Sequence, residues 1–152
     1  MDRLKDNATE IAHIRRVIDG WAAALQRKDA KEVVAHGGPG YAHFSLAPPL
    51  VSDSSGAGGL NAWFDTWQGS LGYEFRELDI ATDGDLAFAF GLVRLSGRKV
   101  GGPDVLLWLR LTLCLKRIAG EWKIVHEHES VPFYMDGSFR AAVDLVPAKG
   151  RP

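Results

Sequence analysis

Two histidines separated by one residue stand near the end of the chain, within the segment Trp122–Val131. A neutral imidazole titrates near physiological pH, so it can take a proton from a substrate and return it. Side chains two residues apart on a strand lie on the same face. His126 and His128 are therefore predicted to lie side by side, and either could act as a general acid or base. In the alternative interpretation, Thr112 or Ser130 holds a buried histidine that has no chemical role.

Alternation within this segment predicts which residues face the interior. Its odd positions carry the lysine and the two glutamates and are predicted to face water, so the even positions, with both histidines, face inward. The preceding residues 118–120, Ile-Ala-Gly, fit a three-residue hairpin loop, which places Arg110 opposite His128. A register error of one residue would reverse this assignment. The predicted inward face gathers Trp108, Arg110, Thr112, His126, His128 and Ser130.

Arg110 is the one cation predicted on that inward face. A buried guanidinium needs acceptors for five N–H donors. Arg110 could therefore hold the carboxylate or enolate oxygen of a substrate. It could equally form an internal ion pair with one of three acids, Glu77, Asp79 or Asp104.

Aromatic residues supply further candidates for a site. Tyr41 shares one face of a short strand with His43 and could donate a hydrogen bond to a carbonyl oxygen, or it could simply pack. Four tryptophans could line a pocket for a flat apolar ligand or belong to an ordinary core; they are Trp21, Trp63, Trp67 and Trp108. A metal site would need a third ligand beside the histidine pair, and no spacing supplies one. The sequence predicts neither a metal nor another cofactor.

The elements that would position these residues follow from periodicity. Apolar residues at three- and four-residue spacing predict a long helix over 8–27, with a capping box formed by Asn7 and Glu10. Asp29 opens a short second helix, and a third helix covers 60–67. Between a short strand, Tyr41–Leu46, and the third helix, the segment Pro48–Gly59 is predicted to be a loop that gates the pocket.

The second half of the chain is predicted to be an antiparallel meander. Its strands cover residues 73–80, 86–93, 105–117 and 122–131. Helices followed by such a meander indicate an α+β domain with helices on one side of a curved sheet. A row of leucines lies on the predicted outer face and is expected to meet a second copy of the chain, giving a homodimer. The row consists of Leu107, Leu109, Leu111, Leu113 and Leu115.

Composition limits the partners and the compartment. The chain has 152 residues with 18 basic and 19 acidic side chains, a formal net charge of -1, so a nucleic-acid partner is not expected. Its longest apolar run, Val105–Leu109, is too short to span a bilayer, and no secretory peptide is visible. The single cysteine, Cys114, allows no internal disulfide. We therefore expect one cytoplasmic domain over residues 1–152, with its core at about 8–147.

The segment Trp122–Phe133 resembles the end of SnoaL-like, ketosteroid-isomerase-like proteins of the nuclear transport factor 2-like superfamily, and 141–147 resembles the tail that often follows. Trp108, Arg110 and Thr112 look like the matching strand. The resemblance implies a cone-shaped, cystatin-like roll, in which a curved mixed or antiparallel sheet wraps a long N-terminal helix and two short helices around an apolar pocket. It also implies that a dimer would form through the outer face of the sheet.

The resemblance leaves the activity open, because this fold hosts isomerases, cyclases, lyases and binding modules. A ketosteroid isomerase uses an Asp base and a protonated Asp, and neither the strand Tyr41–Leu46 nor the predicted inward face carries a carboxylate. Steroid isomerisation by that mechanism is therefore not expected. Two functions remain: an isomerase, cyclase or lyase in which His128 moves a proton on an apolar carbonyl compound while Arg110 and Tyr41 stabilise charge on oxygen, or a non-catalytic ligand-binding or scaffold module.

Overall fold

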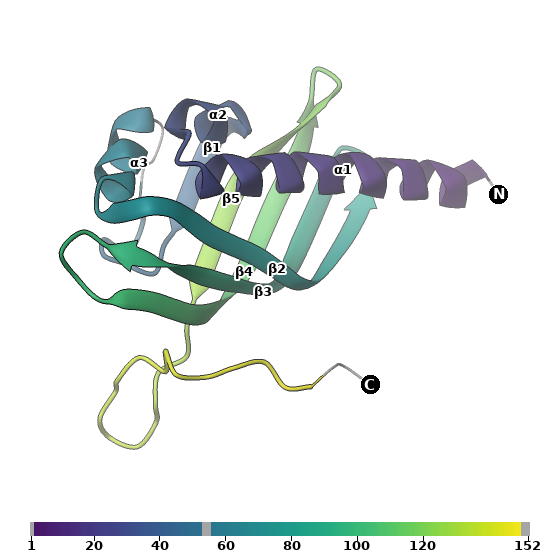
Figure 1. The fold of residues 1–152 in the computed structure, drawn as a ribbon. Coiled ribbons are helices and arrows are strands. Elements are labelled where there is room, and N and C mark those ends of the chain that lie inside the picture. The colour runs from purple at the N-terminus through teal and green to yellow at the C-terminus, as the bar shows by residue number, and fades with distance from the viewer. Residues whose placement is uncertain (1, 53–55, 150–152) are drawn as a thin grey trace.

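The computed structural model describes residues 2–52 and 56–149 and has the predicted α+β architecture. The five strands form one sheet in the order β1-β5-β4-β3-β2, in which β1 runs parallel to β5 and the other pairs are antiparallel (Figure 1). The elements are α1 (Asp2–Gln26), α2 (Ala30–Ala35), β1 (Gly37–Phe44), α3 (Ala57–Phe64), β2 (Trp67–Asp83), β3 (Leu86–Lys99), β4 (Asp104–Ile118) and β5 (Glu121–Ser130).

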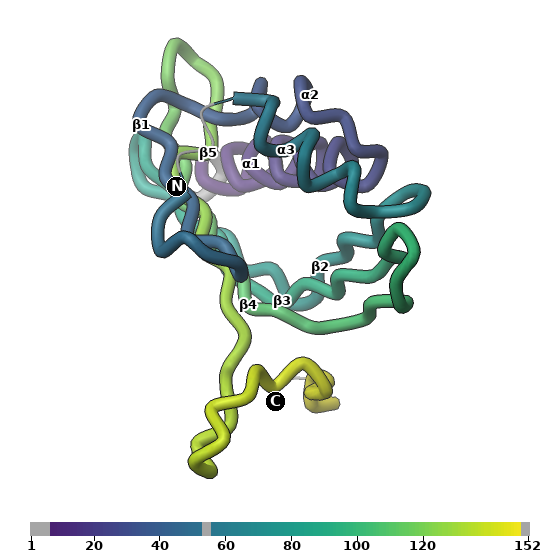
Figure 2. Tube along the Cα trace, turned by 90° about the vertical axis from the view of Figure 1, so that its left-hand side faces the viewer, coloured from purple at the N-terminus to yellow at the C-terminus, as the bar shows by residue number. Residues whose placement is uncertain are grey.

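The long helix α1 lies across the concave side of the sheet, and the sheet curves beneath all three helices (Figure 2). Its predicted apolar stripe is buried, with Ile14 and Ile18 fully enclosed and Trp21 and Leu25 nearly so. The helix begins before the predicted cap at Asn7, so that cap is wrong. The cap at Asp29 is confirmed, because its carboxylate accepts a hydrogen bond from the backbone N–H of Glu32 at the start of α2.

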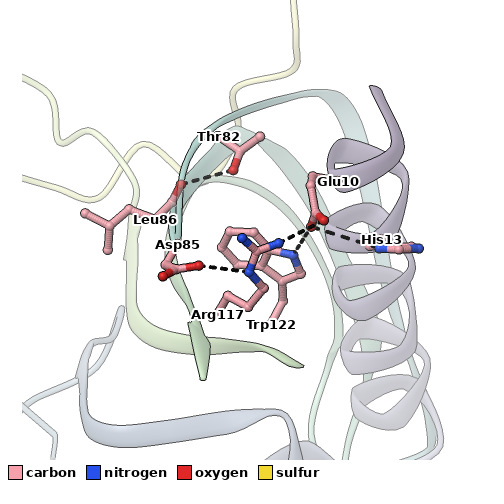
Figure 3. Close-up of polar contacts among 7 residues, drawn as sticks. All are labelled: Glu10, His13, Thr82, Asp85, Leu86, Arg117 and Trp122. Atoms are coloured by element: carbon pink, nitrogen blue, oxygen red, sulfur yellow. Dashed lines mark hydrogen bonds and ion pairs between the residues drawn. The ribbon is translucent and has the colours of Figure 1, made fainter. Parts of the chain in front are cut away.

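Glu10, predicted as half of the capping box, instead ties α1 to the β4–β5 hairpin (Figure 3). One carboxylate oxygen lies 2.8 Å from Nη1 of Arg117, and the other accepts a 2.7 Å hydrogen bond from Nε1 of Trp122. Arg117 also donates from Nε to Asp85 at 2.9 Å. These contacts hold the first half of α1 against the sheet.

The β4–β5 hairpin differs from the predicted register in two places. Its turn has two residues, Ala119 and Gly120, both at positive φ, and Ile118 pairs with Glu121. Val125 is then an extra residue in β5, because the pairing jumps from Ile124 to His126 opposite consecutive residues of β4. The bulge at Val125 reverses the faces of the rest of β5: before it the even positions face inward, and after it the odd positions do.

The leucine row therefore lies inside the monomer. Leu109, Leu111, Leu113 and Leu115 are at most 1% exposed, and Leu107 packs against the same core cluster as Ile14 and Ile18. The prediction that this row lies on the outer face and meets a second subunit is wrong. The leucines do need cover, but the core of the same chain supplies it. No helix in the described part of the chain is long and apolar enough to cross a membrane.

The predicted loop Pro48–Gly59 is only partly a loop. Ser52 returns to β1 and exchanges two backbone hydrogen bonds with His43, at 2.8 and 3.3 Å. Residues 53–55 lie outside the described residues. Helix α3 begins at Ala57, earlier than predicted, and ends at Phe64, so that Trp67 opens β2 instead of closing a helix.

Candidate functional site

A cavity of about 940 Å³ lies between the helices and the concave face of the sheet. Its walls are mainly apolar and aromatic: Trp21 comes from α1, Trp63 from α3, and Trp67 from β2. Three predicted tryptophans therefore line the cavity. Polar side chains enter it from β1, β2 and β5, and these are the candidates for chemistry.

Two glutamates of β5, Glu127 and Glu129, face the cavity. The bulge at Val125 places them on the inner face, where Glu127 pairs with Leu113 and Glu129 with Leu111. Glu127 is 5% exposed, and the side chain of Glu129 is 13% exposed. The expectation that the inner face of these strands carries no carboxylate is wrong.

Strands β1 and β2 bring three partners to these glutamates. The hydroxyl of Tyr41 donates a hydrogen bond to Glu127, and that of Tyr73 donates to Glu129 at 3.2 Å. His43 pairs with Glu127 across the parallel β1–β5 contact. Its Nε2 lies 3.5 Å from Oε1 of Glu127 and 3.9 Å from Oε1 of Glu129. Five ionisable side chains thus meet at one wall of an apolar cavity.

The surroundings favour a neutral, protonated Glu129. Burial raises its pKa well above the ordinary value, and the charge of Glu127 adds to the shift. Burial also raises the pKa of Glu127, but hydrogen bonds donated by Glu129 and Tyr41 oppose that rise. Of the two carboxyl groups, Glu129 therefore has the more strongly raised pKa and is the one that more readily keeps a proton. Burial and the two glutamates raise the pKa of Tyr73, so its hydroxyl stays a neutral donor.

His43 is held in its neutral form. Burial lowers its pKa, and this outweighs the opposing effect of Glu129. Its Nε2 is buried and makes no hydrogen bond within the described residues. An imidazole whose pKa is lowered therefore stands 3.9 Å from a carboxyl group whose pKa is raised, an arrangement suited to acid–base catalysis.

The same residues form the one group of potential metal ligands in the described part of the chain. His43, Glu127 and Glu129 each offer an atom, and these atoms lie within 4.8 Å of one another. A divalent ion could reach all three. The carboxyl groups are already engaged with each other and with the hydroxyls of Tyr41 and Tyr73, whereas Nε2 of His43 makes no hydrogen bond among the described residues. The sequence prediction of no metal stays a prediction.

The predicted site residues divide into two groups. Tyr41, His43, Trp21, Trp63 and Trp67 line the cavity. The predicted strand pair lies on the opposite, outer face of the sheet and takes no part in the cavity wall; it consists of Trp108, Arg110, Thr112, His126, His128 and Ser130. Their predicted inward placement is wrong, because the hairpin turn has two residues instead of three and because β5 contains the bulge at Val125.

The outer-face residues have other contacts. Arg110 is exposed, pairs with Ser130 and donates from Nε to its Oγ at 3.1 Å, whereas the predicted pairing joined it to His128. His128 pairs with Thr112 and is exposed, and Nδ1 of His126 lies 2.8 Å from the backbone oxygen of Ala42. The catalytic roles proposed for His128 and Arg110 rested on a placement that the structure does not have.

Sequence reasoning missed Glu127, Glu129 and Tyr73. The glutamates alternate with histidines and were assigned to a solvated face because they are charged. The leucines of the facing strand held the signal that could have found them. Directly paired residues share a face, so the residues opposite a buried leucine row must also point inward.

The chain was compared with models of protein families, with curated proteins and with solved structures. The family model described as SnoaL-like domain matches residues 14–134. Among solved structures, an NTF2-like protein of unknown function from Pseudomonas putida KT2440 is 26% identical, with a TM-score of 0.80 over 92% of this chain and 98% of that chain. No curated protein matches the chain.

Two further structures are similar in fold alone. A candidate scytalone dehydratase from Novosphingobium aromaticivorans is 18% identical, with a TM-score of 0.73 over 93% of this chain and 97% of that chain. A ketosteroid isomerase-like protein from Erwinia carotovora atroseptica is 21% identical, with a TM-score of 0.68 over 80% of this chain and 95% of that chain. The predicted resemblance and the cystatin-like roll are confirmed.

Proposed function

Because the chain belongs to the SnoaL-like domain family, we propose that it is an isomerase or lyase that moves a proton on an apolar carbonyl compound bound in the cavity. The observation that carries this proposal is the approach of His43 to Glu129, 3.9 Å between Nε2 and Oε1, at one wall of an apolar cavity, where burial lowers the pKa of His43 and raises that of Glu129. The similar folds named as a candidate dehydratase and as ketosteroid isomerase-like agree with this reaction class. Fold similarity alone would not establish it.

The chemistry follows from the protonation states. Nε2 of His43 accepts the proton from the carbon beside the substrate carbonyl, and the electron pair of that C–H bond moves toward the carbonyl oxygen. The protonated carboxyl of Glu129 donates a hydrogen bond or a proton to that oxygen. Donation to an enolate oxygen followed by return of the proton to another carbon gives isomerisation. Donation to a leaving β-hydroxyl group gives loss of water.

The site resets through a short path. In isomerisation His43 gives its proton to the second carbon and Glu129 takes its proton back as the carbonyl re-forms, so both groups end as they began. After loss of water His43 carries an extra proton and Glu129 has lost one, and the two groups lie 3.9 Å apart. The proton returns from His43 to Glu129 with no change in the net charge of the cavity. Tyr73 and Tyr41 donate hydrogen bonds to the two carboxyl groups throughout and hold them in place. Thus His43 takes over the proton-transfer role that the sequence suggested for His128.

The experiment measures hydrogen exchange at carbon. Apolar cyclic ketones are incubated with the protein in D₂O, and deuterium uptake beside the carbonyl is followed by proton NMR. We expect catalysed exchange in the unaltered protein and a loss of about 10²- to 10⁴-fold in His43→Gln and Glu129→Gln. The matched control is His128→Gln on the outer face, which should retain full activity. Exchange that survives in His43→Gln, or a ketone that binds without any exchange, would favour the binding-module alternative.

The proposal includes a homodimer through the outer face of the sheet. In place of the leucine row, this face exposes Phe88 and Phe90, whose rings stack at 6.2 Å, and Phe44, which packs on His126 and His128. Exposed aromatic side chains on the outer face of a sheet are typical of a surface that another chain covers. A second copy would bring the same aromatic surface and bury both.

A further inference from the structure

The cavity wall has an unbalanced set of charges. Its acidic side chains are Glu127 and Glu129, and no lysine or arginine occurs among the described residues that line it. His43 is the one lining residue that could become a cation, and burial opposes its protonation. Arg110, which the sequence analysis offered as a clamp for a substrate carboxylate, lies outside. The wall therefore repels an anionic ligand, and its two glutamates would attract a cationic one.

Aromatic rings surround this acidic wall. Trp21 and Tyr73 meet edge to face at 5.6 Å, and Tyr41 lies 6.3 Å from His43, measured between ring centroids. Trp63 and Trp67 meet at 5.8 Å in the same cavity lining. The electron-rich faces of such rings attract organic cations, and they do so most strongly where water is excluded.

We infer that the cavity binds apolar organic ammonium ions, with the cationic nitrogen at Glu127 and Glu129 and the apolar part against the tryptophans. This inference uses the same site as the proposed function but does not require turnover: an amine would inhibit the reaction competitively, because its binding removes the proton that Glu129 supplies. The cavity of about 940 Å³ is large enough for a molecule of several rings.

Binding should be coupled to the release of a proton. In the empty site, burial and the neighbouring Glu127 raise the pKa of Glu129 well above its ordinary value and favour its protonated form. An ammonium ion beside them stabilises the second carboxylate, so Glu129 loses its proton to solvent as the amine binds. The balance is one ammonium ion taken up and up to one proton released. The other groups facing the pair are His43, whose pKa burial lowers, Tyr73, whose pKa is raised well above its ordinary value, and the hydroxyl of Tyr41.

The test uses three ligands of one shape: 2-(1-naphthyl)ethylamine, 2-(1-naphthyl)ethanol and 1-naphthylacetate. Calorimetric titration near neutral pH, with EDTA present to remove metal ions, gives each dissociation constant. We expect the amine to bind at least about tenfold more tightly than the alcohol, and the carboxylate to bind more weakly than both. Repeating the amine titration in two buffers of different ionisation enthalpy should reveal the released proton.

Glu129→Gln supplies the decisive variant, because it keeps the side-chain shape and removes one ionisable group. The amine should lose part of its advantage over the alcohol, because Glu127 remains, and should release no proton, while the alcohol binds as before. Glu121→Gln is the matched control, since Glu121 is an exposed glutamate at the other end of β5. Equal affinity for amine and alcohol, an undiminished amine preference in Glu129→Gln, or no amine binding at all would overturn the inference. Loss of ketone exchange with amine binding intact would count against the proposed reaction alone.

Discussion

The inward placement of the leucine row can be tested with two neighbouring residues of β4. Leu111 is 1% exposed and sits in the core cluster, whereas Thr112 is exposed on the outer face. Truncation of a fully buried leucine to alanine removes its transfer free energy and leaves a cavity, which together cost about 2–5 kcal/mol. A substitution on an exposed face changes stability by no more than about 0.5 kcal/mol.

For a domain of this size, each 1 kcal/mol lowers the melting temperature by roughly 2–4 °C. Leu111→Ala should therefore melt at least about 4 °C below the unaltered protein, and Thr112→Ala within about 2 °C of it. Differential scanning calorimetry at one protein concentration gives both values. If Thr112→Ala is the more destabilised of the two, the opposite face of β4 points inward. Glu127 and Glu129, which pair with β4, would then not face the cavity.

Three further outcomes follow from the contacts described. Because the pKa of Glu129 is raised in the folded state, the folded protein binds more protons than the unfolded chain, and this group's contribution to stability is lost as pH rises through the folded pKa. The Glu129→Gln variant should therefore become more stable relative to the unaltered protein as pH increases from about 4 to 8. Thermal melts that show a constant difference between the two proteins would contradict the raised pKa. Phe90 is exposed on the outer face, so Phe90→Glu should leave the fold intact and convert a dimer to a monomer in sedimentation velocity, whereas Leu111→Glu places a charge in the core and should unfold the chain. If the unaltered protein is a monomer at micromolar concentration, the proposed dimer is refuted. Trp122→Phe removes the indole donor to Glu10 and should destabilise the protein by about 1–3 kcal/mol in urea unfolding, with Trp108→Phe as the outer-face control.

The helical half of the chain could be predicted because its signals are local. The stripe of α1 and the cap at Asp29 depend on spacing along a few turns, and both are confirmed. Asn7 failed as a cap because nothing in its immediate sequence stops the helix from beginning earlier. In the same way, the boundaries of α3 and β2 shifted by a few residues, which moved Trp67 from a helix to a strand.

The site could be predicted only in part, because it depends on register. Tyr41 and His43 were found from their positions on one short strand. The positions of the β5 residues require the bulge at Val125, and no residue type in 122–131 marks it. One extra residue moved His126 and His128 out of the interior and brought Glu127 and Glu129 in. The rule that charged side chains face water failed here because burial favours the neutral form of Glu129 and tyrosine hydroxyls donate hydrogen bonds to both carboxyl groups.

The central claim is that Glu129 is a protonated acid inside the cavity, and carbon-13 NMR of its side-chain carboxyl measures this directly. With labelled glutamate, the carboxyl shift of Glu129 is followed through a pH titration and compared with that of exposed Glu121 on the same strand. At about pH 6, well above the usual glutamate pKa of about 4.3, Glu121 should be ionised and Glu129 should still carry its proton. Titration of Glu129 together with Glu121 would contradict the account.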